Sequence, residues 1–194
     1  MPILTPPYQW GYKHSSVNGD ATPPGVNFYT QANAGYMRSN SVAEGGNGGS
    51  VWLTTQLGFY WSPGNVANGY LSLSADIAYN FTWICDGSFS TAYAWSWYGF
   101  LVTEFDLNGQ SFATPVNQQI NLWDDNSTNT SDGNQGAVTG INLTAALPVD
   151  NDHYYNIWVQ MMTHAQNNGD GPFSHSAAQS YLNMLVSSIS YTLT

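Results

Sequence analysis

The most regular pattern in this chain is an alternation of apolar and polar residues with a period of two. It is clearest over residues 70–86, YLSLSADIAYNFTWICD, where the odd positions are apolar and most even positions are polar. Successive side chains of an extended strand point to opposite faces of a sheet. The segment is therefore expected to be a strand with one face in a core and the other toward water.

Similar alternation recurs along most of the chain, whereas the apolar spacing of three and four that indicates a helix is not sustained anywhere. The other expected strands cover residues 51–61, 89–106, 110–114, 119–123, 137–147, 153–165 and 177–194. Roughly eight strands with short turns predict an all-β fold of two packed antiparallel sheets, a β-sandwich or jelly roll.

The first 50 residues are interrupted by PPG at 23–25 and EGGNGG at 44–49. We expect residues 1–50 to form an irregular, extended N-terminal arm that crosses the sandwich, and residues 51–194 to form the β-sandwich domain. A disordered tail is the alternative, although this segment carries more aromatic rings than disordered chains usually do.

The stretch TAYAWSWYGF at 91–100 places Tyr93, Trp95 and Trp97 on one face of an expected strand. If this strand forms a hairpin with 70–86, a two-residue turn points the three rings outward, and a three-residue turn buries them. Burying three large rings is worth several kcal/mol more than burying the small residues between them, which favours the core register.

Beyond Ser96 the other face of this strand is apolar as well, with Tyr98, Phe100 and Val102. We expect the N-terminal arm or a neighbouring subunit to cover it.

Charge is unusually sparse. Only 7% of the residues are charged, Lys13 and Arg38 are the only Lys and Arg residues, and the formal net charge is −10. This composition excludes nucleic acid as an expected partner and disfavours anionic membrane surfaces. A surface built from neutral polar residues is typical of secreted or particle-forming β proteins, so we expect an extracellular or virion-surface location. No run approaches 18 apolar residues, so no membrane span is expected.

The single cysteine, Cys85, excludes an intramolecular disulfide framework. It lies in the apolar run NFTWICDG, where we expect a buried, unreactive thiol. The start MPILTPP lacks the features of a signal peptide, which leaves a mature secreted form, an unsecreted protein and a virion component as alternatives.

A saccharide site is expected where a flat ring meets carboxylates and amides at a loop end. The residues WDDN, Trp123, Asp124, Asp125 and Asn126, supply these parts in four positions. Trp61 and Asp170 complete the candidate ligand-binding set. The alternative for Trp123 is a tryptophan at a strand end that closes the core.

Calcium is the cofactor that the acidic loops suggest, because it prefers carboxylate and amide oxygens on loops. Asp124, Asp125 and Asp132 are the candidate ligands, within an expected polar loop at 124–135. A second polar loop at 167–175 would share their end of the sandwich unless Pro115 divides 110–123 into two strands. Capping of turns by Asp and Asn side chains is the alternative role for these residues.

Motifs of known catalytic classes are missing from the sequence. A jelly-roll glycosidase would need two carboxylates across a cleft. The chain has two glutamates, Glu44 and Glu104, of which Glu44 adjoins a glycine run. The four histidines lack metal-ligand spacing and are expected to be surface residues.

The sequence thus favours a non-catalytic, lectin-like carbohydrate-binding module. The main alternative is a structural subunit of a capsid, fibre or other extracellular assembly, in which the chain would form a homo-oligomer, and a glycosidase is the third. The first two differ in a simple way. An assembly protein should bury the rings at 98–102 between chains, and a lectin should expose rings beside acidic residues.

Overall fold

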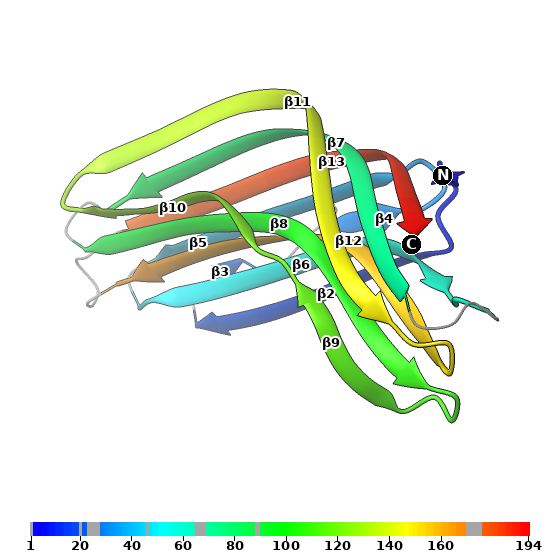
Figure 1. The fold of residues 1–194 in the computed structure, drawn as a ribbon. Helices are drawn as coiled ribbons and strands as arrows, with labels where there is room; N and C mark the ends of the chain where they lie inside the picture. Colours follow the sequence, from blue (N-terminus) through cyan, green and yellow to red (C-terminus); the bar gives the residue numbers. More distant parts are fainter. Residues whose placement is uncertain are drawn as a thin grey trace.

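A computed structural model describes residues 2–19, 21–22, 28–45, 47–64, 69–87, 90–169 and 176–194. Across these residues the regular secondary structure consists of β-strands, which form two antiparallel sheets packed face to face (Figure 1). The expected all-β sandwich is therefore confirmed.

One sheet has seven strands and supplies one wall of the core. These strands are β1 (Ile3–Leu4), β3 (Ala21–Thr22), β4 (Tyr29–Gln31), β5 (Tyr36–Gly45), β7 (Gly69–Asp86), β11 (Ser131–Val149) and β13 (Ser176–Leu193). Their order is β11-β7-β13-β5-β3, with β1 paired to β13 and β4 paired to β5.

The second sheet has six strands and carries the candidate site described below. Its members are β2 (Trp10–Gly19), β6 (Gly49–Trp61), β8 (Thr91–Asp106), β9 (Ser111–Asn117), β10 (Ile120–Thr128) and β12 (His153–Asn168). Their order is β10-β8-β12-β6-β2, and β9 pairs with β8 beyond the end of β10. Consecutive strands such as β5, β6, β7 and β8 alternate between the two sheets, as in a jelly roll.

The core lies between the sheets and is filled by alternate residues of each long strand. On β7 the inward residues include Leu71, Leu73 and Ile77, all buried, while Ser72 and Asp76 face solvent. The alternation in the sequence therefore identified the inward face of this strand correctly.

The hairpin expected between residues 70–86 and 89–106 is wrong. β7 pairs with β11 and β13 in one sheet, and β8 pairs with β12, β10 and β9 in the other. The connection crosses between the layers, where the amide of Ser90 donates to the carbonyl of Gly87 at 2.9 Å. Neither hairpin register applies, because the partner of β8 comes from a distant part of the chain.

The polar loop expected at 124–135 is also mostly strand. β10 continues to Thr128 and β11 begins at Ser131, so that the reversal is confined to Asn129 and Thr130. Asn129 has a φ of 57°, in the left-handed region that asparagine tolerates better than most residues. Pro115 lies within β9, and the break between β9 and β10 falls at residues 118–119.

Residues 1–50 were expected to be irregular, but their described part is mostly strand. β5 lies inside the seven-stranded sheet between β13 and β3, and β2 forms the edge of the six-stranded sheet beside β6. The Tyr8 hydroxyl, between β1 and β2, donates to the carbonyl of Val186 at 3.0 Å. This segment thus contributes to both sheets.

No helix in the described residues is long and apolar enough to cross a membrane.

Candidate functional site

The aromatic stretch of β8 has its rings on the outer face of the six-stranded sheet. Ala92, Ala94 and Phe100 are fully buried in the core, whereas Tyr93 and Trp95 are partly exposed. The expectation that the rings fill the core is wrong, because crossing to the other sheet turns the small residues of this segment inward. Tyr93 and Trp95 are accessible from solvent, whereas Trp97 on the same face is buried, with 7% of it exposed.

Trp95 belongs to a row of side chains that runs across four strands. In the sheet register, His164 of β12 is opposite both Trp52 of β6 and Trp95 of β8, and Trp95 is opposite Asp124 of β10. We call these four residues the aromatic row. Side chains opposite each other in neighbouring strands share one face of a sheet.

The rings of the aromatic row are in contact with one another. His164 stacks on Trp52 with centroids 3.7 Å apart and planes 18° from parallel. Trp95 meets Trp52 edge to face, at 5.4 Å and 89°. The two indoles and the imidazole therefore form one cluster whose surface is partly open to solvent.

A hollow of about 320 Å³ lies over this cluster. Its wall consists of Trp52, Tyr93, Trp95, Asp124, His164, Gln166 and Asn168. The amide of Gln166 donates to Asn168 Oδ1 at 2.7 Å, so that polar groups are held along one side of the hollow. Aromatic faces, a carboxylate and amides thus converge on one space.

Burial of His164 determines its charge. The side chain is 6% exposed, and its burial lowers the pKa of the imidazole to about 4, so that it is neutral at pH 7. Among the described residues, neither His164 Nε2 nor the indole Nε1 of Trp95 has a hydrogen-bond partner, although both atoms are buried. Buried polar atoms are normally paired, so these two ring nitrogens are exceptions among the described residues.

Only part of the candidate set from the sequence is found here. Asp124 lines the hollow, and Asn126 lies opposite Tyr93 in the next row of the same face. Asp125 is the intervening residue and is half-buried; its Oδ1 accepts from the amide of Asn126 at 2.9 Å.

Trp123 is not a surface ring. It is 7% exposed, its indole N–H donates to Ser180 Oγ at 3.1 Å, and its ring stacks on Phe81 at 5.4 Å. The interpretation of Trp123 as a sugar-stacking residue is therefore wrong, and the alternative, a tryptophan that closes the core, describes its position.

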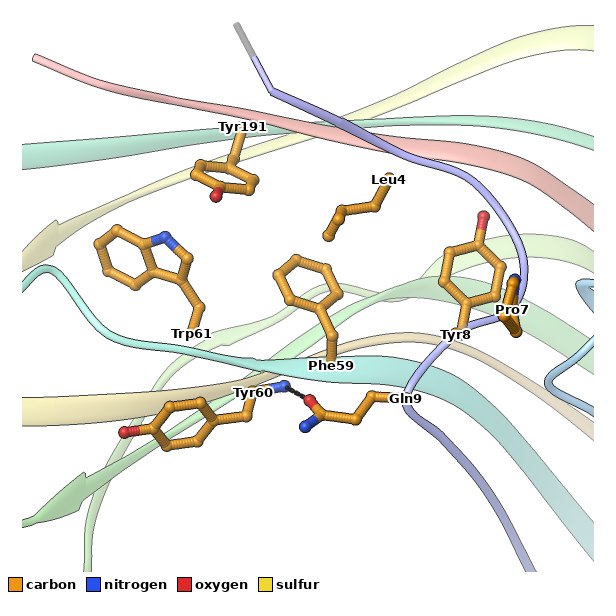
Figure 2. Close-up of a pocket in the computed structure, with 8 residues that line it drawn as sticks. All are labelled: Leu4, Pro7, Tyr8, Gln9, Phe59, Tyr60, Trp61 and Tyr191. Carbon is orange, nitrogen blue, oxygen red and sulfur yellow. Dashed lines mark hydrogen bonds between the residues drawn. The ribbon is translucent and has the colours of Figure 1, made fainter.

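Trp61 lies in a different place. It is 8% exposed and lines a cavity of about 280 Å³ near the N-terminal segment, together with Phe59, Tyr191 and Leu4 (Figure 2). This cavity and the hollow over the aromatic row share no lining residue. Asp170, the last member of the candidate set, lies outside the described residues.

The three carboxylates expected to bind calcium are not grouped. The Asp132 side chain belongs to β11, where Asp132 is opposite Cys85, and its Oδ1 accepts from the amide of Gly133 at 2.7 Å. Local hydrogen bonds of this kind match the turn-capping alternative. Within the described residues, the one group of three His, Cys, Asp or Glu side chains close enough to share a metal is Glu104, Asp150 and His153.

Cys85 is free and buried, and burial raises the pKa of its thiol to about 12. The protonated thiol is a poor nucleophile, which agrees with the expected unreactive role.

The two glutamates are too far apart for a retaining glycosidase. Glu44 is opposite Ala177, which is itself opposite Asp86 at the end of the sandwich where β8 begins. Glu104 lies near the other end of β8. This pair does not provide carboxyl groups about 5 Å apart.

If the protein were an assembly subunit, the apolar face of β8 at 98–102 was expected to lie between chains. In the structure this face lies inside one chain. Tyr98, Phe100 and Val102 belong to the core cluster between the two sheets of one chain.

Four residues of the hollow were missed from the sequence: Trp52, His164, Gln166 and Asn168. Trp52, Gln166 and Asn168 alternate with buried residues of β6 and β12, such as Val51 and Asn167, whereas His164 is itself buried. A search for aromatic and amide residues at outward positions of expected strands, rather than at their ends, could have found them.

Neither a family model nor a curated protein matches the sequence. Solved structures show only distant similarity, and the first described here is a carbohydrate-binding module of the β-sandwich superfamily. It is 15% identical with a TM-score of 0.24, over 82% of this chain and 57% of its own length. The chain thus spans little more than half of that structure.

The second is the enzymatically active domain of tailspike protein 4 of bacteriophage CBA120, 12% identical with a TM-score of 0.23, over 83% of this chain and 20% of its own length. The third is infectious bursal disease virus Gx strain, 10% identical with a TM-score of 0.17, over 95% of this chain and 41% of its own length. Similarities at this level do not indicate a function.

Proposed function

We propose that this protein is a non-catalytic carbohydrate-binding module, and that the saccharide lies in the hollow over the aromatic row. The observation that carries the proposal is the alignment of Trp52, His164 and Trp95 across three strands, with two buried ring nitrogens that lack partners in the described residues.

Each part of the hollow matches a feature of a sugar. The exposed faces of Trp52 and Trp95 can stack against the C–H groups of a pyranose ring, which gains apolar burial without a charge. His164 Nε2 and the Trp95 N–H are buried, and once neighbouring side chains move aside each can pair with a sugar hydroxyl, which both donates and accepts hydrogen bonds. Asp124 and Gln166 supply further polar partners on the rim.

The charge of the chain limits which saccharides fit. The net charge is −10, and Asp124 adds a carboxylate at the hollow itself. An acidic polysaccharide would be repelled, so the ligand is a neutral saccharide. A surface poor in ions and rich in neutral polar residues supports an extracellular role for such a module.

The site that we propose is on the face of a sheet, not at the loop end expected from the sequence. The strands fix the side chains of the aromatic row, and the rings of Trp52 and His164 hold each other in place. Little conformational entropy is then lost when a ligand binds.

The test is retention of the protein by neutral polysaccharides in affinity gels, followed by a glycan array, each with and without calcium. We expect wild type and Tyr70→Ala, which removes an exposed ring from the other sheet, to be retained equally. Trp95→Ala should lose at least about tenfold in affinity, as expected for removal of a central aromatic contact. Absence of any retained saccharide, or equal retention of Trp95→Ala, would refute the proposal.

A further inference from the structure

A second group of side chains, away from the aromatic row, has the composition of a metal site. Glu104 of β8, His153 at the start of β12 and Asp150 in the preceding turn each offer a ligand atom, and these atoms lie within 4.8 Å of one another. Glu104 and Trp95 are nine residues apart on β8 and face opposite sides of the sheet. That separation is roughly 30 Å along a strand.

The imidazole of His153 faces carboxylates. Its Nδ1 lies 3.0 Å from Glu104 Oε1, 3.8 Å from Asp150 Oδ2 and 3.8 Å from Asp152 Oδ1. The same nitrogen is buried and makes no hydrogen bond with any described residue, so the short distance to Glu104 does not have hydrogen-bond geometry. A nitrogen that lies near several carboxylates without a hydrogen bond to any of them can bind one metal ion together with them.

The distances fit a small divalent ion. With metal–ligand bonds of about 2.1 Å, two donors of a tetrahedral site are separated by roughly 3.4 Å. The separations of His153 Nδ1 from Glu104 Oε1 and from Asp150 Oδ2, 3.0 and 3.8 Å, lie on either side of that value. Only small side-chain shifts would bring all three atoms onto one ion.

The surroundings hold these ligands in place. The Tyr155 hydroxyl donates to Glu104 Oε1 at 2.9 Å and accepts from the amide of Asp150 at 2.9 Å, so one phenol links two of the three residues. Phe112 stacks on the ring of His153 at 4.8 Å. Hydrogen-bonded supports of this kind are typical of metal ligands.

The negative charge of the cluster is not balanced by a basic residue. The chain has two, Lys13 and Arg38. Lys13 Nζ lies over the ring of Phe28 and Arg38 over the ring of Tyr29. A protonated His153 could neutralise one carboxylate, but the cluster would still be acidic, whereas a divalent cation could balance it.

From this geometry we propose that Glu104, Asp150 and His153 bind a divalent transition-metal ion, with Zn²⁺ as the fitting example. The imidazole donor favours Zn²⁺ over Ca²⁺ and Mg²⁺, which prefer ligand sets made of oxygen atoms. The metal would join the turn before β12 to β8 at this end of the sandwich. The proposal is independent of saccharide binding.

The test is titration of chelator-treated protein with Zn²⁺, Ca²⁺ and Mg²⁺, by calorimetry and by the shift of the melting temperature. Wild type should bind one Zn²⁺ per chain and melt at a higher temperature with it, and so should His14→Gln, a control at an exposed histidine on β2. His153→Gln and Asp150→Asn should bind at least about tenfold more weakly, and Tyr155→Phe about 10–100-fold more weakly.

Asp150 is half exposed, so Asp150→Asn keeps the test informative if His153→Gln does not fold. The proposal is overturned if wild type takes up no Zn²⁺, if Asp150→Asn binds Zn²⁺ as tightly as wild type, or if Ca²⁺ binds as tightly as Zn²⁺. A protonated His153 that simply pairs with Glu104 would give the first of these results.

Discussion

The imidazole of His164 lies against the indole of Trp52, with ring centroids 3.7 Å apart and ring planes 18° from parallel. This stacking joins β12 to β6 on the outer face of the six-stranded sheet and removes the imidazole from water. Burial keeps the imidazole neutral at pH 7, and both rings line the hollow.

Stability should decrease in acid because of His164. Burial lowers its pKa to about 4, against about 6.5 in an unfolded chain, so between these pH values the unfolded state binds more protons. The free energy of unfolding should therefore fall as the pH drops from 6.5 toward 4. His164→Phe keeps a ring against Trp52 without the titration, and it should lose about 2 kcal/mol less over this range.

Urea unfolding at pH 7 and pH 4.5 measures this difference, with His14→Gln as the control for an exposed histidine. If His164→Phe and wild type lose equal stability between the two pH values, His164 does not titrate as the structure requires.

The two faces of β8 should respond differently to truncation. Phe100 is fully buried, so Phe100→Ala should lower the free energy of unfolding by about 3–5 kcal/mol. Trp95 is partly exposed, and Trp95→Ala should cost clearly less while abolishing saccharide retention. Chemical denaturation of both variants gives the comparison, and a larger loss for Trp95→Ala would mean that the faces of β8 are assigned the wrong way round.

Trp123 should matter for stability and not for binding. Its indole N–H donates to Ser180 Oγ, which in turn donates to the carbonyl of Trp95 at 3.0 Å. Trp123→Phe removes the first donor and should cost about 1–3 kcal/mol. Denaturant unfolding and affinity gels on the same sample separate the two effects. Saccharide retention lost in a fully folded Trp123→Phe would restore Trp123 as a ligand-binding residue.

Strand alternation was sufficient to predict the sandwich, because a period of two follows directly from backbone geometry. It identified the inward face of β7, and it gave β12 and β13 nearly their full extent. Asp124 was a candidate because it follows Trp123 in the sequence, whereas in the structure it lies opposite Trp95.

The pairing of strands could not be predicted in the same way. The partners of β8 are β12, β10 and β9, and the choice between β7 and β12 depends on contacts between residues distant in sequence. The core register was preferred from the sequence because it buries three large rings, which placed Trp95 inside; the observed partners place Trp95 on the outer face and Phe100 in the core. The aromatic row could not be predicted for the same reason, because Trp52, Trp95 and His164 are neighbours only when β6, β12 and β8 are paired in this register.

The most direct test of the saccharide site compares indole N–H signals in nitrogen-15 NMR spectra during titration with a retained neutral oligosaccharide. Single Trp→Phe variants assign the signals of Trp52, Trp95 and Trp123. We expect the Trp95 and Trp52 signals to move on binding, because their rings line the hollow, and the hydrogen-bonded Trp123 signal to stay in place. Binding that leaves the Trp95 and Trp52 signals unmoved would contradict the account.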